Sequence, residues 1–209
     1  ADAPPAVERY PEPKLQPTTW ELKLRLGTPK RIAVRTPGQD AAKAYWYLPY
    51  TVTNLGEDNV EFDPVIEMLI DGKTIRANRA LPSEVFDAIK RKEGNKLLTT
   101  AQKIVGTIKP GDDQARDGVA IWPEPQARMG TFTVFFAGLS GETVTVKKVG
   151  DKFVPIDPTK AADELKDVKE EDRRNLRKQF SVTYRVLGDE VSPGTDPVQK
   201  RSEQWVMRD

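Results

Sequence analysis

Four aromatic residues gather in one short stretch of the sequence, which makes it the leading candidate for a binding surface. Tyr45, Trp46, Tyr47 and Tyr50 lie in a run that alternates, so Tyr45 and Tyr47 share one side of a predicted strand. If that side is exposed and Trp122 lies near it, the rings could stack on sugars or contact a partner chain. The competing interpretation is that one side faces the core and an inserted helix covers the other. The candidate binding residues are therefore Tyr45, Tyr47 and Trp122.

Three carboxylates between two predicted strands form the candidate metal site. Asp112, Asp113 and Asp117 supply the hard oxygen ligands that Ca²⁺ prefers, and such a site needs neither His nor Cys. The spacing differs from that of an EF-hand loop, and Arg116 would offset part of the charge. Asp and Gly also form turns, so a plain loop is the favoured interpretation. Ca²⁺ at this loop is the one cofactor that the sequence suggests.

Other patterns of reactive residues are weaker. Gly138 to Glu142 resembles the nucleophile elbow G-x-S-x-G, but Glu142 replaces the last Gly and no His is present to act as a base. The 32 acidic residues guarantee some carboxylate pair by chance, so a carboxylate-based hydrolase is the least favoured hypothesis. Short basic runs at 90–92 and 173–174 have acidic neighbours, which is typical of helix ends rather than of nucleic-acid binding.

The composition excludes several classes of function. The 209 residues contain no Cys and no His, which removes thiol nucleophiles, Ser-His-Asp triads, zinc fingers and iron–sulfur clusters. Lys and Arg (33) nearly balance Asp and Glu (32), so no binding to nucleic acid or to an anionic membrane is expected. No apolar run approaches the ~18 residues that a membrane span requires. We therefore expect no nucleic-acid partner and no membrane insertion.

A period of two dominates the sequence from residue 20 onward and predicts short β-strands. Apolar and polar residues alternate over 20–26, 45–53 and 180–186, and Asp71-Gly72 predicts a hairpin. Pro49 lacks a backbone donor, so its strand is expected at a sheet edge or beside a bulge. Many short strands without crossover helices predict an all-β protein, namely an immunoglobulin-like β-sandwich with two helical insertions. A β-barrel is the alternative.

The two helical insertions are expected near 82–93 and 158–174, where apolar residues recur at helical spacing. In the first, acidic residues come early and basic residues late, which complements the helix dipole. Residues 1–19 contain five prolines and predict a Pro-rich N-terminal tether, followed by one domain over 20–209. The start, Ala-Asp-Ala-Pro-Pro without Met, favours an exported chain from which a signal peptide has been removed.

Several turn-and-strand motifs resemble those of known bacterial proteins. The motifs are YTVTN (50–54), DGK (71–73), IKPGD (108–112) and GVAIWP (118–123). They resemble the immunoglobulin-like domains of unknown function on bacterial exported proteins and lipoproteins, and the chain as a whole looks like uncharacterised exported proteins of the planctomycete type. The resemblance covers residues 20–209, implies an immunoglobulin-like sandwich and an extracytoplasmic location, and carries over no catalytic residue. The chain departs from it in its larger helical insertions and in lacking the lipoprotein Cys.

Together these patterns predict a non-enzymatic exported protein, periplasmic or extracellular, that acts by binding. We expect an accessory or structural subunit of an envelope-associated assembly, whose protein partner contacts the strand at 45–50 or a sheet edge near Pro49. The alternative is a carbohydrate-binding module, which would need two or three coplanar exposed rings. A hydrolase would need a cleft with two carboxyl groups ~5–9.5 Å apart.

Overall fold

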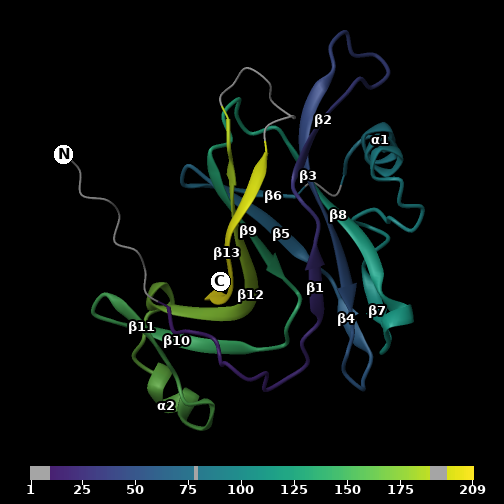
Figure 1. The fold of residues 1–209 in the computed structure, drawn as a ribbon. Coiled ribbons are helices and arrows are strands. Elements are labelled where there is room, and N and C mark those ends of the chain that lie inside the picture. Colours follow the sequence, from purple (N-terminus) through teal and green to yellow (C-terminus); the bar gives the residue numbers. More distant parts are fainter. Residues whose placement is uncertain (1–9, 78–79, 189–196) are drawn as a thin grey trace, which may run out of the picture.

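The chain forms two layers of antiparallel β-sheet with short helices at the periphery, as the computed structural model shows (Figure 1). The structure describes residues 10–77, 80–188 and 197–209. One sheet has four strands: β1 (Lys23–Leu26), β2 (Lys30–Val34), β3 (Lys43–Thr53) and β8 (Arg116–Pro123). The other has seven: β5 (Val65–Ile70), β6 (Lys73–Arg76), β9 (Thr131–Ala137), β10 (Thr143–Val149), β11 (Lys152–Pro155), β12 (Arg173–Val186) and β13 (Val198–Arg208). A small separate pair is β4 (Val60–Phe62) and β7 (Gly106–Ile108).

The protein is therefore an all-β sandwich, as predicted. The order of the described strands leaves both large sheets open, which argues against the barrel alternative. The hairpin predicted at Asp71-Gly72 joins β5 to β6, and both turn residues have positive φ angles of 46° and 74°. Such a turn matches the twist of the strands that it connects.

β3 is the central strand of the four-stranded sheet, which corrects the prediction of a sheet edge near Pro49. β8 pairs with one side of β3, and β1 and β2 follow each other along the other side. Gly27, between β1 and β2, donates its backbone N–H to the Pro49 carbonyl (2.8 Å). Pro49 has no backbone N–H to donate. The side of β3 on which this donor is missing faces the interruption between β1 and β2, where no regular strand pairing is lost. Pro49 also pairs with Val119 on its other side, so no open edge for a partner lies there.

β12 spans the whole length of the seven-stranded sheet. Along one side it pairs first with β10, over residues 173–177, and then with β9, over 180–185, whereas β13 pairs with the other side. Between β9 and β10 the chain bends at residues 138–142, where Gly138 has a φ of 89° and packs against the backbone of Asp63. The sheet turns sharply at this bend (Figure 1).

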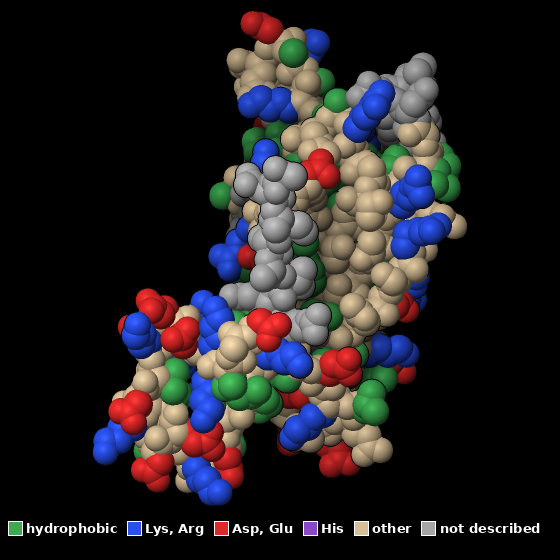
Figure 2. Space-filling view, turned by 90° about the vertical axis from the view of Figure 1, so that its left-hand side faces the viewer, with side chains coloured by type: hydrophobic (Ala, Val, Ile, Leu, Met, Phe, Trp, Pro, Cys, Tyr) green, Lys and Arg blue, Asp and Glu red, His purple; other side chains and the backbone are tan. Residues whose placement is uncertain are grey.

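The bend creates a lower lobe, which we define as residues 10–19, β10, β11, the helix α2 (Ala161–Leu165) and residues 173–177 of β12. It has a small core of its own, formed by Val146, Phe153 and Leu176, to which β13 adds Met207. Tyr10 packs against Phe153 with ring centroids 5.3 Å apart, so the described part of the predicted tether lies against the domain. Charged side chains of both signs gather on this lobe, whereas the sheet face above it is largely uncharged (Figure 2).

The main core lies between the two sheets and is rich in aromatic residues. Trp46 meets Phe132 with centroids 6.2 Å apart, and Tyr50 meets Phe136 at 5.6 Å. Both contacts join a strand of one sheet to a strand of the other, so they hold the layers together. Burial of each such ring removes a large apolar area from water, and this burial stabilises the fold by about 25 cal/mol per Å² of apolar surface.

One helical insertion is confirmed and the other is wrong. α1 (Ser83–Glu93) matches the prediction for 82–93 and ends at Gly94, which adopts the left-handed conformation (φ 63°). Residues 158–174 form only α2 between two 3₁₀ turns, and β12 begins at Arg173. The apolar stripe in 158–174 is narrow, and pairing of β12 with β10 competes for its last residues, Arg173 and Arg174. Among the described residues, no helix is both long and apolar enough to cross a membrane.

Candidate functional site

The aromatic candidates are buried, so the prediction of an exposed contact surface at Tyr45, Tyr47 and Trp122 is wrong. Tyr45 and Tyr47 lie on the side of β3 that α1 covers, in one cluster with Val85. Trp122 lies in the core between the sheets, where its indole N–H donates to the Ile75 carbonyl (3.0 Å). The competing interpretation, burial beneath an inserted helix, holds for the two tyrosines.

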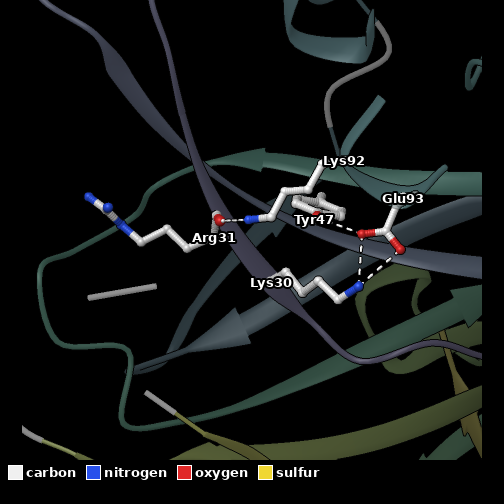
Figure 3. A network of polar contacts seen from close by, with 5 residues as sticks. All are labelled: Lys30, Arg31, Tyr47, Lys92 and Glu93. Atoms are coloured by element: carbon white, nitrogen blue, oxygen red, sulfur yellow. Dashed lines mark hydrogen bonds and ion pairs between the residues drawn. The ribbon is translucent and has the colours of Figure 1, made fainter. Parts of the chain in front are cut away.

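A network of polar contacts anchors the end of α1 to β2 and β3 (Figure 3). The Tyr47 hydroxyl donates to Glu93 (2.7 Å), Lys30 pairs with the same carboxylate (2.8 Å), and Lys92 donates to the Arg31 carbonyl (3.0 Å). Burial and the Glu93 carboxylate raise the pKa of the Tyr47 phenol. Burial also acts to raise the pKa of Glu93, but the hydrogen bonds from Lys30 and Tyr47 and the nearby charges lower it overall. The network is therefore a structural anchor.

Replacing Glu93 by Gln is expected to lower the free energy of unfolding by about 1–2 kcal/mol at neutral pH, because charge-assisted hydrogen bonds are lost. A carboxylate whose pKa is lowered by folding stabilises the protein above its ordinary pKa, and this contribution disappears as the pH falls through the folded-state value. The difference between wild type and Glu93→Gln should therefore shrink in acid. Urea denaturation across pH measures it, with Glu57→Gln in an exposed loop as the control. A difference that is constant with pH would contradict this role.

The structure does not gather the three candidate metal ligands. Asp112 and Asp113 lie in a 3₁₀ turn before β8. Asp117 lies in β8, where its two carboxylate oxygens accept hydrogen bonds from Thr51 (2.7 Å) and Asn95 (2.8 Å). Within the described ranges, no three Asp or Glu side chains lie close enough together to hold a metal ion. These residues therefore serve the turn and the strand, and the Ca²⁺ hypothesis gains no support.

The segment that resembles a nucleophile elbow forms the bend of the seven-stranded sheet. The Ser140 hydroxyl accepts a hydrogen bond from the backbone N–H of Glu142 (3.2 Å). Gly141 donates its N–H to the Trp20 carbonyl (3.1 Å), and a Cβ at Gly141 would lie only 2.6 Å from the Trp20 indole nitrogen. Ser140 and Gly141 thus bring the N-terminal segment against the bend.

A groove of about 680 Å³ lies within the lower lobe, between its N-terminal segment and β10. Residues 11–19 form one wall, and the start of β10 together with residues 155–161 forms the other. Pockets that hold small molecules measure roughly 300–1,000 Å³, and the volume of this groove falls within that range. Its lining combines apolar side chains with hydroxyl groups, among them Thr18, Thr19, Thr143, Val144, Ile156 and Met207. We call it the lower groove.

Within residues 10–77, 80–188 and 197–209, no strand pairs with the start of β10 on the side that faces the lower groove. β11 ends at Pro155, and the following residue, Ile156, donates to the Thr145 carbonyl (2.9 Å). Backbone groups of alternate residues in a strand point to the same side, so Thr143 directs its N–H and C=O to the same side as Thr145, beyond the end of β11. The groove therefore contains a short open strand edge.

A buried lysine joins the walls of the lower groove. Lys178 is 2% exposed and forms ion pairs with Glu21 (2.9 Å) and Glu142 (3.4 Å), beneath the Trp205 ring at 4.9 Å. Its ammonium also donates to the Lys14 carbonyl (3.4 Å), and the Lys14 N–H donates to Glu142 (3.0 Å). Lys178 therefore ties β12 and the bend to the N-terminal segment.

Two large apolar side chains are exposed on the N-terminal segment beside the lower groove. Leu15 is fully exposed, and Trp20 is 39% exposed. Every Trp, Tyr and Phe of the chain lies in the described ranges, and among them Trp20 is the exposed one. Exposed apolar side chains at the rim of a concave site are typical anchors for a partner.

Sequence reasoning missed the lower groove because its walls come from segments about 130 residues apart in the chain. One signal could have indicated it. The period of two in β12 places Lys178 on the same side as Phe180 and Val182, and a charge at such an inward position requires a buried partner. Glu21 and Glu142 are those partners, but the sequence does not identify which of its acidic residues they are.

Comparisons with known proteins add little. No protein-family model matches the chain, and no curated protein matches it. Among solved structures, the chain is similar to the crystal structure of the yjhA protein from Bacillus subtilis, with 11% sequence identity and a TM-score of 0.37. The similarity covers 81% of this chain and 97% of that chain. It is too weak to support an inference about function.

Proposed function

We propose that this protein is a non-enzymatic binding domain that holds an extended segment of a protein partner in the lower groove. One observation carries the proposal: an unpaired strand edge and exposed apolar side chains meet at a groove of about 680 Å³. A segment added to an open strand edge gains main-chain hydrogen bonds, and neighbouring side chains select its sequence. Thr143 would supply the backbone groups, and Leu15 and Trp20 would supply apolar contacts.

A carbohydrate-binding module that holds a sugar between stacked aromatic rings has less support than the peptide-binding proposal. Such a site requires two or three coplanar exposed rings. Trp20 is the one exposed aromatic residue, and the residues that line the lower groove include no aromatic side chain. Hydrogen bonding through a strand edge therefore fits this groove better than stacking.

The hydrolase alternative has the least support. Glu142 lines the lower groove, and it shares the Lys178 ammonium with Glu21. An acid/base pair needs one carboxyl group that holds a proton and one that accepts it. Glu21 and Glu142 both pair with the buried Lys178 ammonium, an arrangement that suits a structural ion pair better than catalysis.

We also propose that the partner belongs to an envelope-associated assembly and that the protein is exported, periplasmic or extracellular. This part rests on the resemblance of its turn-and-strand motifs to bacterial exported proteins. The immunoglobulin-like character of the sandwich rests on the same motifs. Cell fractionation of a producing bacterium tests the location, and a cytoplasmic pool alone would contradict it.

Blocking the lower groove is expected to abolish peptide binding. Selection of a random peptide library on the immobilised protein should enrich sequences that bind in extended form. Ala161→Trp fills the groove from α2, and Leu15→Ser removes the exposed anchor. We expect the first variant to lower affinity at least tenfold and the second severalfold, as measured by isothermal titration calorimetry.

The matched control is Leu97→Ser, which changes another exposed leucine (76% exposed) beyond the end of α1. It should bind the selected peptides as wild type does. The proposal fails if no peptide is enriched, or if Ala161→Trp binds the selected peptides as tightly as wild type while retaining its fold by circular dichroism.

A further inference from the structure

The outer side of the seven-stranded sheet is a second surface with an unusual composition. β9, β12 and β13 lie next to one another, and their register brings alternate residues together on the side away from the core. We call this surface the neutral face and define it by the exposed or partly exposed residues Thr131, Thr133, Thr183, Ser202 and Gln204; Ser181, in register with them, is buried. Figure 2 shows a broad tan area, with few charged side chains, above the charged lower lobe.

The neutral face lacks charge, although the chain as a whole is 31% charged. Between Arg185 at its upper end and Arg208 at its lower end, none of the residues of β9, β12 and β13 that the register pairs on this side is Lys, Arg, Asp or Glu. Arg201 lies at the bulge of β13 and donates to the side chain of Gln199, which pairs with Arg185 at the upper end. An ordinary solvated sheet face carries charges, which also prevent unwanted association. A surface whose centre is depleted in charged residues is instead typical of a binding site.

The chemistry of the neutral face matches a ligand with many hydroxyl groups. Hydroxyl and amide groups both donate and accept hydrogen bonds, whereas Lys and Arg only donate and carboxylates only accept. Thr133 and Thr183 lie side by side with their hydroxyl oxygens 2.9 Å apart, and each retains capacity for a further bond. Neighbouring strands are about 4.8 Å apart, so three strands present rows of such groups over roughly 10 Å.

A protein partner fits this face less well. Protein interfaces are enriched in aromatic residues, Met and Arg and are depleted in Ser. The neutral face has the opposite composition, and its one aromatic neighbour, Phe135, is half-buried beneath Arg208, whose guanidinium carbon lies 4.2 Å from the ring centroid. Arg208 is in turn held by Glu67 (2.7 Å), so the ring is not offered for contact.

We propose that the neutral face binds an uncharged polysaccharide through hydrogen bonds. This site is separate from the lower groove, and it does not use the stacked rings of a typical sugar-binding module. The neutral face and an uncharged polysaccharide would not attract each other through charge. The affinity of the protein for the polysaccharide should therefore be nearly independent of salt concentration.

Co-sedimentation of the full chain with insoluble neutral polysaccharides (cellulose, chitin, curdlan and mannan) tests this proposal. The double variant Ser202→Glu with Gln204→Glu places two charges on exposed positions of the neutral face. For at least one polysaccharide we expect binding by the wild type and a loss of at least tenfold in the double variant. The control, Thr28→Glu with Gln102→Glu, makes similar changes at exposed positions away from this face and should bind within about twofold of wild type.

Three results would overturn the proposal: no polysaccharide of the panel retains the wild type, both double variants bind equally, or high salt releases the bound protein. Circular dichroism of each variant separates loss of binding from loss of fold. A peptide that occupies the lower groove should leave polysaccharide binding unchanged, so this test and that of the proposed function can fail independently.

Discussion

Trp122→Ala is expected to lower the free energy of unfolding by about 3–5 kcal/mol, which is the usual loss when a buried Trp is truncated. Trp122 is 1% exposed and lies in the core between the two sheets. Its removal leaves a large cavity and also leaves the Ile75 carbonyl without the indole donor. Urea denaturation followed by circular dichroism measures the loss.

The matched control is Trp20→Ala, which truncates the exposed Trp and should cost at most about 1 kcal/mol. This pair separates a core residue from a contact residue of the same type. If Trp122→Ala folded with wild-type stability, the burial of Trp122 would be wrong, and its role as a binding residue would have to be considered again.

Lys178→Met is expected to destabilise the protein by about 3 kcal/mol, because removing one partner of a buried ion pair leaves an uncompensated charge. The carboxylate oxygens of Glu21 and Glu142 that face this ammonium accept no aligned hydrogen bond from the described residues. Without Lys178 they would be left with no compensation. We also expect faster amide hydrogen exchange at Lys14, whose N–H donates to Glu142.

Two comparisons show whether the effect of Lys178→Met comes from charge. Adding Glu21→Gln and Glu142→Gln to Lys178→Met should recover most of the stability, since no unpaired charge then remains. Lys200→Met breaks an exposed pair with Glu203 (2.7 Å) and should change stability by less than about 1 kcal/mol. A loss at Lys178 no larger than that at Lys200 would contradict the buried ion pair.

The period of two was sufficient to predict the sandwich, because each strand buries one side and turn residues mark its ends. β3 and the Asp71-Gly72 hairpin are examples, since both follow directly from local sequence. Residues 158–174 show the limit of such reasoning. Their narrow apolar stripe fits a helix, yet Leu176 and its neighbours gain more from pairing in β12 and from burial in the lower lobe.

The candidate site was less predictable than the fold. The sequence indicates that Tyr45 and Tyr47 share one side of a strand, but it does not indicate whether α1 covers that side. The lower groove depends on a bend at 138–142 and on contacts between residues 11–19 and the distant β10. Such long-range contacts leave no local pattern, so only the structure brings them together.

The most direct test of the proposed function is to map where a selected peptide binds. Titration of the ¹⁵N-labelled protein with the peptide, followed by two-dimensional NMR, reports every backbone amide whose surroundings change. Our account predicts the largest amide shifts at residues 14–16, 18 and 19 and at Gly141, Thr143 and Thr145, with little change around α1. Shifts confined to α1 or to the neutral face, with the lower groove unaffected, would contradict it.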